Sequence, residues 1–459
     1  MPKKKTALTI EERLQQALVP AEEQPYEVPE NWVWTYISSG FDVTSSKRVH
    51  KSDWLSEGVP FYRTRELVKL SEQGYIDNEL FISEDLYKTF KKEFGVPQKN
   101  DLLISGVGTI GVPYVISDEK KFYFKDGNVI WLKNKGVFDA SYMYYLYKTV
   151  FVDNQIHSMS AGTTVDTYTI INAKNTIIPL PPLSEQQRIV ERIEELFAKL
   201  DEAKERLQEV ADSFAVRKAA ILHKAFTGEL TKQWRRENGV SDESWEESNF
   251  GKFTVSQYGY TEKAHWEKVG PKFLRITDIQ DNKVDWDEVP WCPIDEAGMK
   301  QYAVQIGDIM IARTGATTGK SYLICDDVEA VFASFLIRLK VVDKNLDYNY
   351  LYGYMQSEDY WRQITDFSSG IAQPGVNANK LKQIKFKCPS RPEQHEIVRL
   401  IDDLLARERA AQQATEQALA SIDLMKKSIL ARAFRGELGT NKASEASALE
   451  LLRQVLAEG

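Results

Sequence analysis

The sequence has little cysteine, little histidine and no excess of positive charge. Its three cysteines, Cys292, Cys325 and Cys388, lie far apart and form no CxxC pair. This spacing argues against a zinc site and a disulfide framework, and the five histidines are equally scattered. No apolar run reaches the roughly 18 residues that a membrane helix needs. These absences predict a cytoplasmic protein with no metal centre and no membrane anchor.

The net charge of −8 argues against a chain that holds nucleic acid by bulk positive charge. Any contact with DNA must therefore come from local patches, or from partners that supply basic surface. The 459 residues suffice for about three domains, and the aromatic content of 11% is rich enough for well-formed cores.

A tandem repeat organises the chain. The hexapeptide AFTGEL (225–230) returns as AFRGEL (433–438), and residues 185–230 align with 393–438 without a gap. Upstream, GVPFYRTREL resembles GPKFLRITDI, and QKNDLLISGVGTIG resembles QIGDIMIARTGATTG. Each copy thus carries a variable module followed by a well-matched helical segment. In each hexapeptide the glycine is the residue type that ends a helix in the left-handed conformation.

The two helical segments show an apolar repeat with alternating steps of four and three residues, which is typical of a coiled-coil seam. Arg217 is the polar member of the first seam, and Glu408 and Thr415 interrupt the second. We expect the two helices to pack on each other rather than join one globular core. The predicted seam comprises Ile189, Ile193, Leu196, Leu200, Ala203, Leu207, Val210, Phe214 and Ile221, and Ile397, Ile401, Leu404, Ala411, Ala418, Ile422, Met425 and Ile429.

The modules read as mixed α/β. The runs DLLISG, KFYFKDGNVIWLK, DIMIAR and VFASFLIRLK are β-rich, whereas 139–149 and 347–364 read as helices. The predicted organisation is an N-terminal arm with a short helix (1–25), a first module (26–183), a first long helix (184–230), a linker (231–244), a second module (245–389), a second long helix (390–438) and a tail with a short helix (439–459).

The stretch GATTGKS (315–321) invites a nucleotide-binding interpretation but does not fit one. A phosphate-binding loop needs four residues between its first glycine and the Gly-Lys pair, and this stretch has three. The following SYLICDD reads as a strand where a helix should begin. No other catalytic motif is present, so we expect no catalytic residue in this chain.

Paired polar loops remain as the candidate site. Arg63 and Arg275 each follow a core phenylalanine by two residues, so both side chains should leave the strand on the same face. Arg, Gln, Asn, Ser and Thr are the residue types that contact base edges and phosphates. Taken singly, each of these residues is more commonly a solvated turn residue. The candidate DNA contacts are Arg63, Arg65, Ser105, Thr109, Ser160, Thr163, Thr164, Arg275, Thr277, Arg313, Thr314, Thr317, Thr318, Lys320, Gln373, Asn377 and Asn379.

Three stretches carry a family resemblance. IPLPPLSEQQRIVERIEELFAKLDEAK (178–204), AILHKAFTGELT (220–231) and ILARAFRGEL (429–438) resemble the conserved regions of the specificity subunit of type I restriction–modification systems. The strands at Asp101 and Asp308 resemble those of its target recognition domains. The resemblance covers roughly residues 26–438.

The resemblance implies a pseudo-twofold tandem duplicate: two α/β target recognition domains separated by two long antiparallel coiled-coil helices. It implies that each domain reads one half of a split asymmetric sequence in double-stranded DNA. It implies that the helices set the gap and dock two methyltransferase subunits, with two restriction subunits added in complexes that cleave. S-adenosylmethionine, ATP and Mg²⁺ are then expected on the partner subunits and not on this chain.

Two alternatives stay open at this point. The first is a scaffold that assembles a DNA-modifying complex through its helices without reading DNA. The second is an NTP-dependent enzyme that uses Gly315–Ser321.

Overall fold

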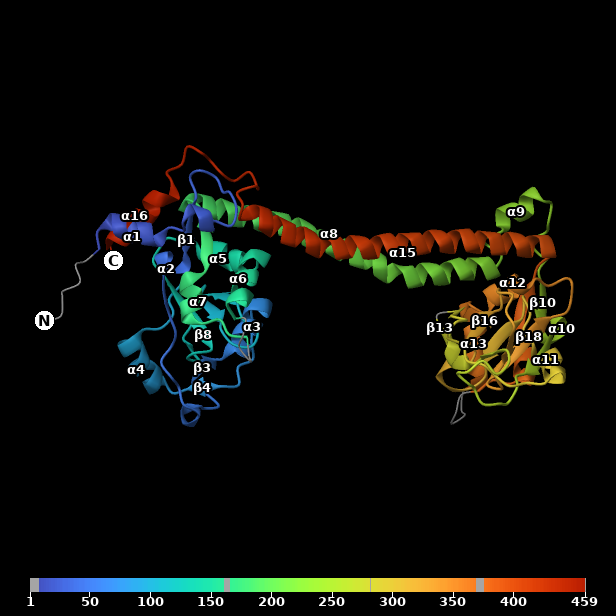
Figure 1. The fold of residues 1–459 in the computed structure, drawn as a ribbon. Helices are drawn as coiled ribbons and strands as arrows, with labels where there is room; N and C mark the ends of the chain where they lie inside the picture. The colour runs from blue at the N-terminus through green and yellow to red at the C-terminus, as the bar shows by residue number, and fades with distance from the viewer. Residues whose placement is uncertain (1–7, 161–165, 281, 369–374, 459) are drawn as a thin grey trace. The chain divides into compact units, whose positions relative to one another are not determined.

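The chain is described by a computed structural model that covers residues 8–160, 166–280, 282–368 and 375–458. It divides into two compact units. Unit 1 comprises Met1–Arg206 with Ala418–Gly459, and unit 2 comprises Leu207–Gln417. Each unit therefore combines one module with part of each long helix (Figure 1).

The first module is built on a four-stranded antiparallel sheet in the order β2-β8-β5-β6. These strands are β2 (Phe41–Thr44), β5 (Leu102–Ser105), β6 (Pro113–Val115) and β8 (Val129–Asn134). A second sheet has β3 between β4 and β7, with β3 and β7 parallel, and β1 pairs with β9. Their bounds are β1 (Val33–Tyr36), β3 (Val59–Tyr62), β4 (Phe81–Ile82), β7 (Tyr123–Phe124) and β9 (Ile177–Leu180).

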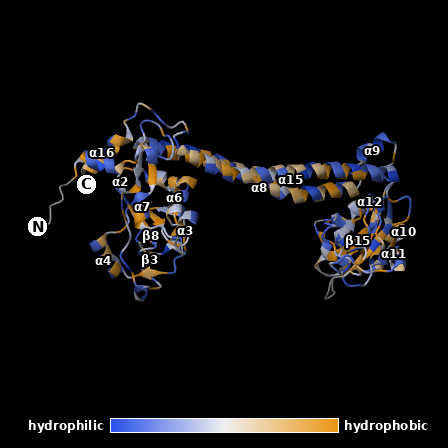
Figure 2. Ribbon diagram, in the orientation of Figure 1, coloured by the Kyte–Doolittle hydropathy of each residue, from blue (hydrophilic) through white to orange (hydrophobic). Residues whose placement is uncertain are grey.

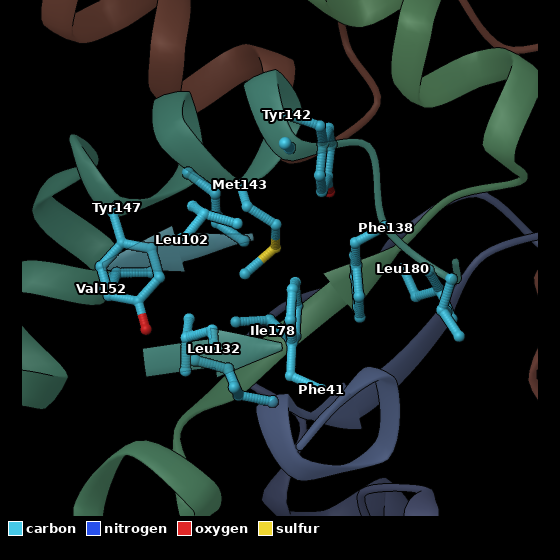
Figure 3. Close-up of a cluster of buried hydrophobic side chains, with 14 of the residues drawn as sticks. Phe41, Leu102, Leu132, Phe138, Tyr142, Met143, Tyr147, Val152, Ile178 and Leu180 are labelled. Atoms are coloured by element: carbon cyan, nitrogen blue, oxygen red, sulfur yellow. The ribbon is translucent and has the colours of Figure 1, made fainter. Parts of the chain in front are cut away.

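Helices and sheet share one core in unit 1. Figure 3 shows Met143 and Tyr147 of α5 pointing toward Leu102 and Leu132 of the sheet. Full burial of such side chains contributes about 1.5–3 kcal/mol each. The helices are α1 (Ile10–Ala17), α2 (Ile37–Gly40), α3 (Thr64–Gln73), α4 (Glu84–Phe94), α5 (Ala140–Tyr147), α6 (Val150–Ser160), α7 (Ile170–Asn175) and, from the tail, α16 (Ala448–Glu458).

Unit 2 repeats this plan. Its four-stranded antiparallel sheet has the order β11-β18-β15-β16, β12 pairs in parallel with β17, and β10 pairs with β19. The strands are β10 (Glu246–Asn249), β11 (Thr254–Tyr258), β12 (Lys272–Leu274), β13 (Ile279–Gln280), β14 (Lys283–Val284), β15 (Ile309–Ala312), β16 (Ser321–Leu323), β17 (Ala330–Phe332), β18 (Leu336–Val341) and β19 (Lys385–Cys388). The helices are α9 (Lys232–Glu237), α10 (Phe250–Phe253), α11 (Glu296–Tyr302), α12 (Tyr348–Tyr354), α13 (Glu358–Ser368) and α14 (Ala378–Lys382). The predicted duplication and the mixed α/β class are confirmed.

Both segments predicted as helical are helical, with one helix in 139–149, and one helix and part of a second in 347–364. Residues 139–149 contain α5 and reach Thr149, whose hydroxyl accepts the N–H of Val152 at 3.2 Å and so starts α6. Residues 347–364 contain α12 and the first part of α13, where Ser357 plays the same part by accepting the N–H of Tyr360. A hydroxyl that binds a backbone N–H two or three residues ahead favours a new helix start over continuation.

The long helices are α8 (Leu183–Phe226, 44 residues) and α15 (Arg391–Ala433, 43 residues). At ~1.5 Å per residue each extends roughly 65 Å. In unit 1, Ile189 and Ile193 at the start of α8 share a core with Leu430 near the end of α15. In unit 2, Leu222 near the end of α8 shares a core with Ile397 at the start of α15. The helices are therefore antiparallel within each unit, and apolar and polar residues alternate along both (Figure 2).

Most of the predicted seam is at least half-buried, but three positions are wrong. Val210 is 40% exposed, Met425 is 50% exposed, and Ala411 is also exposed. Near the second module the most buried positions of α8 are Leu222 and Ala225 and not the predicted Ile221. The reason is that α10, α12 and β19 cover α8 there from a second side.

The repeated hexapeptides end the helices as predicted, with φ of +84° at Gly228 and +75° at Gly436. The segment after each hexapeptide then binds a buried glutamate at the start of the other long helix. In unit 1, Glu185 accepts hydrogen bonds from Asn441 at 2.9 Å and from the Trp32 indole at 2.8 Å. These hydrogen bonds connect the start of one long helix, the segment after the end of the other and the module. We call this set of contacts around the buried glutamate the joint of the unit.

Unit 2 contains the same joint. Glu393 accepts from Thr231 at 2.7 Å, from Arg235 at 2.7 Å and from the Trp245 indole at 3.0 Å. In each copy the next residue is a buried glutamine that binds the module: Gln186 accepts the N–H of Asp139 at 2.7 Å, and Gln394 accepts that of Asp347 at 2.8 Å. The repeated sequence therefore encodes a repeated joint.

The arm, linker and tail complete these joints. The predicted helix of the arm is α1, and its capping box between Thr9 and Glu12 is present. In unit 1, α1 packs against α16, and Arg13 donates to the carbonyl of Leu456. The linker between the copies contains the short helix α9, which carries Arg235 into the unit 2 joint.

Candidate nucleic-acid interface

The polar loops of the first module gather at one edge, where β2, β3, β5 and β7 all end. The N–H of Lys125 after β7 donates to the carbonyl of Tyr62 at the end of β3 at 2.8 Å. The N–H of Gly106 after β5 donates to Asn128 at 2.8 Å, and the N–H of Gly127 reaches the hydroxyl of Ser45, which follows β2. These bonds hold the loops together as one surface.

The second module builds the same edge from β11, β12, β15 and β17. The N–H of Ala333 after β17 donates to Leu274 at the end of β12 at 2.9 Å. The N–H of Arg313 after β15 donates to Phe335 at 3.1 Å, and that of Ser334 donates to Tyr260 after β11 at 2.9 Å. The topology therefore places two equivalent loop surfaces, one on each module.

Arg63 and Arg275 occupy equivalent positions on these surfaces, but they do not lie within the strands as predicted. Each is the residue just before a helical turn, and each pairs with the carboxylate three residues later. Arg63 donates to Glu66 through Nε at 3.0 Å and Nη2 at 2.7 Å. Arg275 donates to Asp278 through Nε at 3.1 Å and Nη2 at 2.6 Å. Both side chains stay 30% exposed, so each arginine orders its loop and still faces outward.

In the first module, Arg63 and Arg65 strongly favour the charged form of Glu66. Burial of Glu66 acts to raise its pKa, but the hydrogen bonds and charge of Arg63 and Arg65 outweigh burial and hold that pKa at about 2. Arg65 is exposed and also reaches Glu79 at 2.8 Å. The carboxylates neutralise much of the positive charge at this edge, in keeping with the chain's net charge of −8.

Three of the predicted contacts are wrong, because their side chains are buried. The hydroxyl of Ser105 accepts the N–H of Val112 at 2.8 Å and closes the loop after β5. Ser160 donates to the carbonyl of His157 at 3.0 Å, and Thr318 donates to that of Gly315 at 2.8 Å. These hydroxyls form hydrogen bonds with the backbone of their own turns or loops.

The other candidates fall into three groups. Thr109, Thr277, Lys320, Asn377 and Asn379 are exposed, although the Asn377 side chain also accepts the N–H of Lys380. Arg313, Thr314 and Thr317 are half-buried in the loop that follows β15. Thr163, Thr164 and Gln373 lie outside the described residues.

Contacts around Arg313 join three loops of the second module. Its guanidinium lies 5.0 Å from the ring centroid of Tyr258, and Thr314 forms a β-bridge with Gly375. The hydroxyl of Tyr258 accepts the N–H of Ala378 beside Asn377. The predicted residues of these separate loops are therefore brought together, as a shared surface requires.

Exposed aromatic residues were missed by the sequence interpretation. Trp266 is 71% exposed and lies over the guanidinium of Arg275 at 5.5 Å, and Phe335 is 59% exposed beside Arg313. In the first module the equivalent loop after β2 instead presents Lys47 and Arg48. Aromatic and basic residues in the loops that follow strands were the available signal. Apolar rings suit thymine methyl groups and base faces, whereas Lys and Arg suit phosphates and guanine.

The stretch Gly315–Ser321 does not form a phosphate site. A short 3₁₀ turn over Gly315–Thr317 is followed by strand β16, not by a helix whose N-terminus would bind phosphate. Among the described residues there is no cluster of three or more metal-ligating side chains. No helix in the described part of the chain is long and apolar enough to cross a membrane.

The duplicated modules, each with a polar loop surface and a long helix, define a two-module DNA-specificity protein. A model of the type I restriction modification DNA specificity domain matches residues 29–212 and again 244–419. The chain therefore belongs to this family. As a specificity subunit it is not itself catalytic, and it works in a type I restriction–modification complex with DNA and with methyltransferase and restriction subunits.

Relatives and solved structures agree with this assignment. The chain is 26% identical over 453 residues to the type I restriction enzyme EcoBI specificity subunit of Escherichia coli, across 92% of this chain and 90% of that protein. It is 27% identical over 343 residues to the StySPI specificity subunit of Salmonella potsdam, across 71% and 73%. The crystal structure of the HsdS subunit from Thermoanaerobacter tengcongensis shares the fold, with a TM-score of 0.65 and 18% identity over 90% of this chain and 99% of that chain.

Proposed function

We propose that each module reads one half of a bipartite DNA target through its loop surface, and that the two long helices set the gap between the half-sites. The observation that carries this proposal is the repeated edge. The same strand ends and the same Arg–carboxylate pair recur in both modules, while the surrounding side chains differ: Lys47 and Arg48 in one, Tyr258, Trp266 and Phe335 in the other. One frame with two sets of side chains is what two different half-sites require.

The proposal extends to the partners. Two methyltransferase subunits dock on the duplicated helices, since a duplicated pair of joints offers equivalent positions to two copies of one partner. S-adenosylmethionine, ATP and Mg²⁺ are carried by the partner subunits in the cytoplasm. Those subunits also supply the basic surface that this acidic chain lacks.

Exchange of one module tests the assignment. Residues 26–157 or 245–388 are replaced by the corresponding segment of a relative, and adenine methylation of genomic DNA is mapped for the reconstituted complex. Each exchange should change one half-site and leave the other half and the gap intact. A complex whose methylated sequence is unaffected by both exchanges is a scaffold that does not read DNA.

A further inference from the structure

Unit 2 contains an open cavity of about 750 Å³ beside the end of α8. It lies where α8 meets α12, α13 and the β10–β19 pair. Its walls include Phe226, Thr227, Glu247, Tyr354, Asp359 and Lys385. None of these residues takes part in the loop surface proposed to read DNA.

The duplication shows what occupies the equivalent place in unit 1. Tyr26 of the N-terminal arm lies there, 4.8 Å from the ring centroid of Trp34 and 5.4 Å from that of Phe151. Its hydroxyl donates to the carbonyl of Phe434 at 3.2 Å, and the Arg435 guanidinium lies over its ring at 5.1 Å. The counterparts of these four residues in unit 2 are Glu247, Asp359, Phe226 and Thr227, and all four line the cavity. The arm thus fills in unit 1 the site that is open in unit 2.

The backbone contacts of the equivalent strands β1 and β10 differ in the same way. In unit 1 the arm runs along β1: Leu18 forms a β-bridge with Thr35, and the N–H of Val19 donates to the carbonyl of Trp34 at 3.0 Å. In unit 2 the equivalent strand β10 pairs with β19 alone among the described residues. Trp34 and Thr35 are buried, whereas Glu247 is exposed and Ser248 is half-buried. The free edge of β10 can accept one further extended segment.

The side chains indicate the charge of that segment. The two aromatic walls around Tyr26 are replaced by the carboxylates Glu247 and Asp359, and the cation Arg435 is replaced by Thr227. Val150, at the start of α6, is likewise replaced by Glu358. Asp359 accepts hydrogen bonds from Tyr354 and Arg362, and Glu247 lies 3.7 Å from Lys385 with its side chain 70% exposed. The lining carries four carboxylates, Glu247, Glu358, Asp359 and Asp366, against three cations, Arg362, Lys385 and Lys387. Arg362 and Lys385 already pair with Asp359 and Glu247, but the remaining negative excess disfavours a phosphate backbone and favours a cationic side chain in place of the tyrosine.

We propose that this cavity is a docking site for an extended segment of a methyltransferase subunit, which adds to the edge of β10 and places a Lys or Arg side chain between Glu247 and Asp359. The choice of partner rests on the proposed function, because α8 is one of the helices on which that subunit is proposed to dock. In unit 1 the chain's own arm makes the equivalent contact, so the two docked copies are held by different contacts.

Binding of purified methyltransferase subunits to the full chain tests the proposal. Glu247→Lys should weaken binding of one of the two copies at least tenfold, and Glu247→Gln should weaken it less, as measured by titration and native mass spectrometry. Val255→Lys, at an exposed position on β11, is the matched control and should bind both copies normally. Because Glu247 is exposed, these variants should fold, which circular dichroism checks.

A photo-crosslinking residue at position 247 supplies a second readout. It should form an adduct with a Lys- or Arg-bearing segment of the methyltransferase subunit, and the same residue at position 255 should not. Unchanged affinity of Glu247→Lys, or an adduct only with a second copy of this chain, would overturn the docking proposal while the proposed function stands. A wild-type chain that binds no methyltransferase subunit would overturn both.

Discussion

Arg217 of α8 donates through Nε to Glu408 of α15 at 2.9 Å. In the sequence these residues interrupt two apolar seams, but in unit 2 they face each other and neutralise each other's charge. The repeat aligns Arg217 with Met425 and Glu408 with Leu200. An Arg–Glu pair therefore forms when α8 meets α15, whereas either helix paired with a second copy of itself would set a charge against an apolar side chain. Such a polar pair specifies partner and register.

This pair predicts a measurable coupling between the two positions. Arg217→Met and Glu408→Leu should each destabilise unit 2, because each leaves one partly buried charge without its partner. The double variant should recover most of that loss, with a coupling of about 1 kcal/mol in a double-mutant cycle. Thermal unfolding followed by circular dichroism gives the values. Additive effects would mean that the pair does not contribute to helix pairing.

The long helices predict a dependence of the DNA gap on helix length. Removal of residues 203–209 and 411–417 takes one heptad from each helix, or ~10 Å, and keeps the apolar stripes in register. DNA advances ~3.4 Å per base pair, so the unread gap should shorten by about three base pairs. Both half-site sequences should stay the same in methylation mapping.

A deletion of two to four residues from α8 alone is the control for the heptad deletion. It should disrupt assembly, since the apolar stripe then rotates away from its partner helix. An active complex that carries the paired heptad deletion but keeps its original gap would show that the helices do not set the spacing.

Loss of the reading-loop arginines predicts effects confined to one half-site. Arg63→Ala should reduce discrimination in one half by about 1–3 kcal/mol, and Arg275→Ala should do the same in the other half. Each variant is the matched control for the other. Because Glu66 is only 2% exposed, Arg63→Ala should also lower the melting temperature. Unchanged affinity and unchanged discrimination in a folded variant would assign the arginines to loop structure alone.

The joint of unit 1 predicts a pH dependence. Burial raises the pKa of Glu185, despite hydrogen bonds from Trp32 and Asn441 and the charge of Arg188. Between its ordinary pKa and this raised value the folded chain binds more protons than the unfolded chain, so this contribution to stability falls as pH rises through the window. Glu185→Gln should remove that fall. Hydrogen exchange of the start of α8 between pH 4 and pH 8 measures it, and an identical pH profile in the variant would refute it.

Glu66 predicts a pH dependence of the opposite sign. Its pKa is held at about 2, so its contribution is complete above the ordinary pKa of a glutamate and is lost as pH falls toward 2. Glu66→Gln should weaken the loop at neutral pH and flatten the acid side of the profile. A variant that loses stability equally at pH 2 and pH 7 would show that Glu66 acts by shape and not by charge.

The sequence alone determined the duplication, the mixed α/β modules and the two long helices. These features follow from local patterns: a gapless repeat, β-rich runs bounded by turn residues, and a heptad spacing that marks which face of a helix is buried. The glycine at each helix end was equally predictable, because the left-handed conformation favours glycine over other residue types.

Tertiary structure decided which polar residues face outward and which are used inside. Ser105, Ser160 and Thr318 have the residue types of DNA contacts, yet turns bury them. In the sequence Arg217 and Glu408 interrupt the apolar seams, and only the pairing of the two helices places their side chains 2.9 Å apart. Glu185 and Glu393 are the first residues of the two aligned segments, and the tertiary structure shows that each binds the segment that follows the end of the other helix. The reason is physical: periodicity records burial within one element, whereas the partner of a polar group is set by residues distant in the chain.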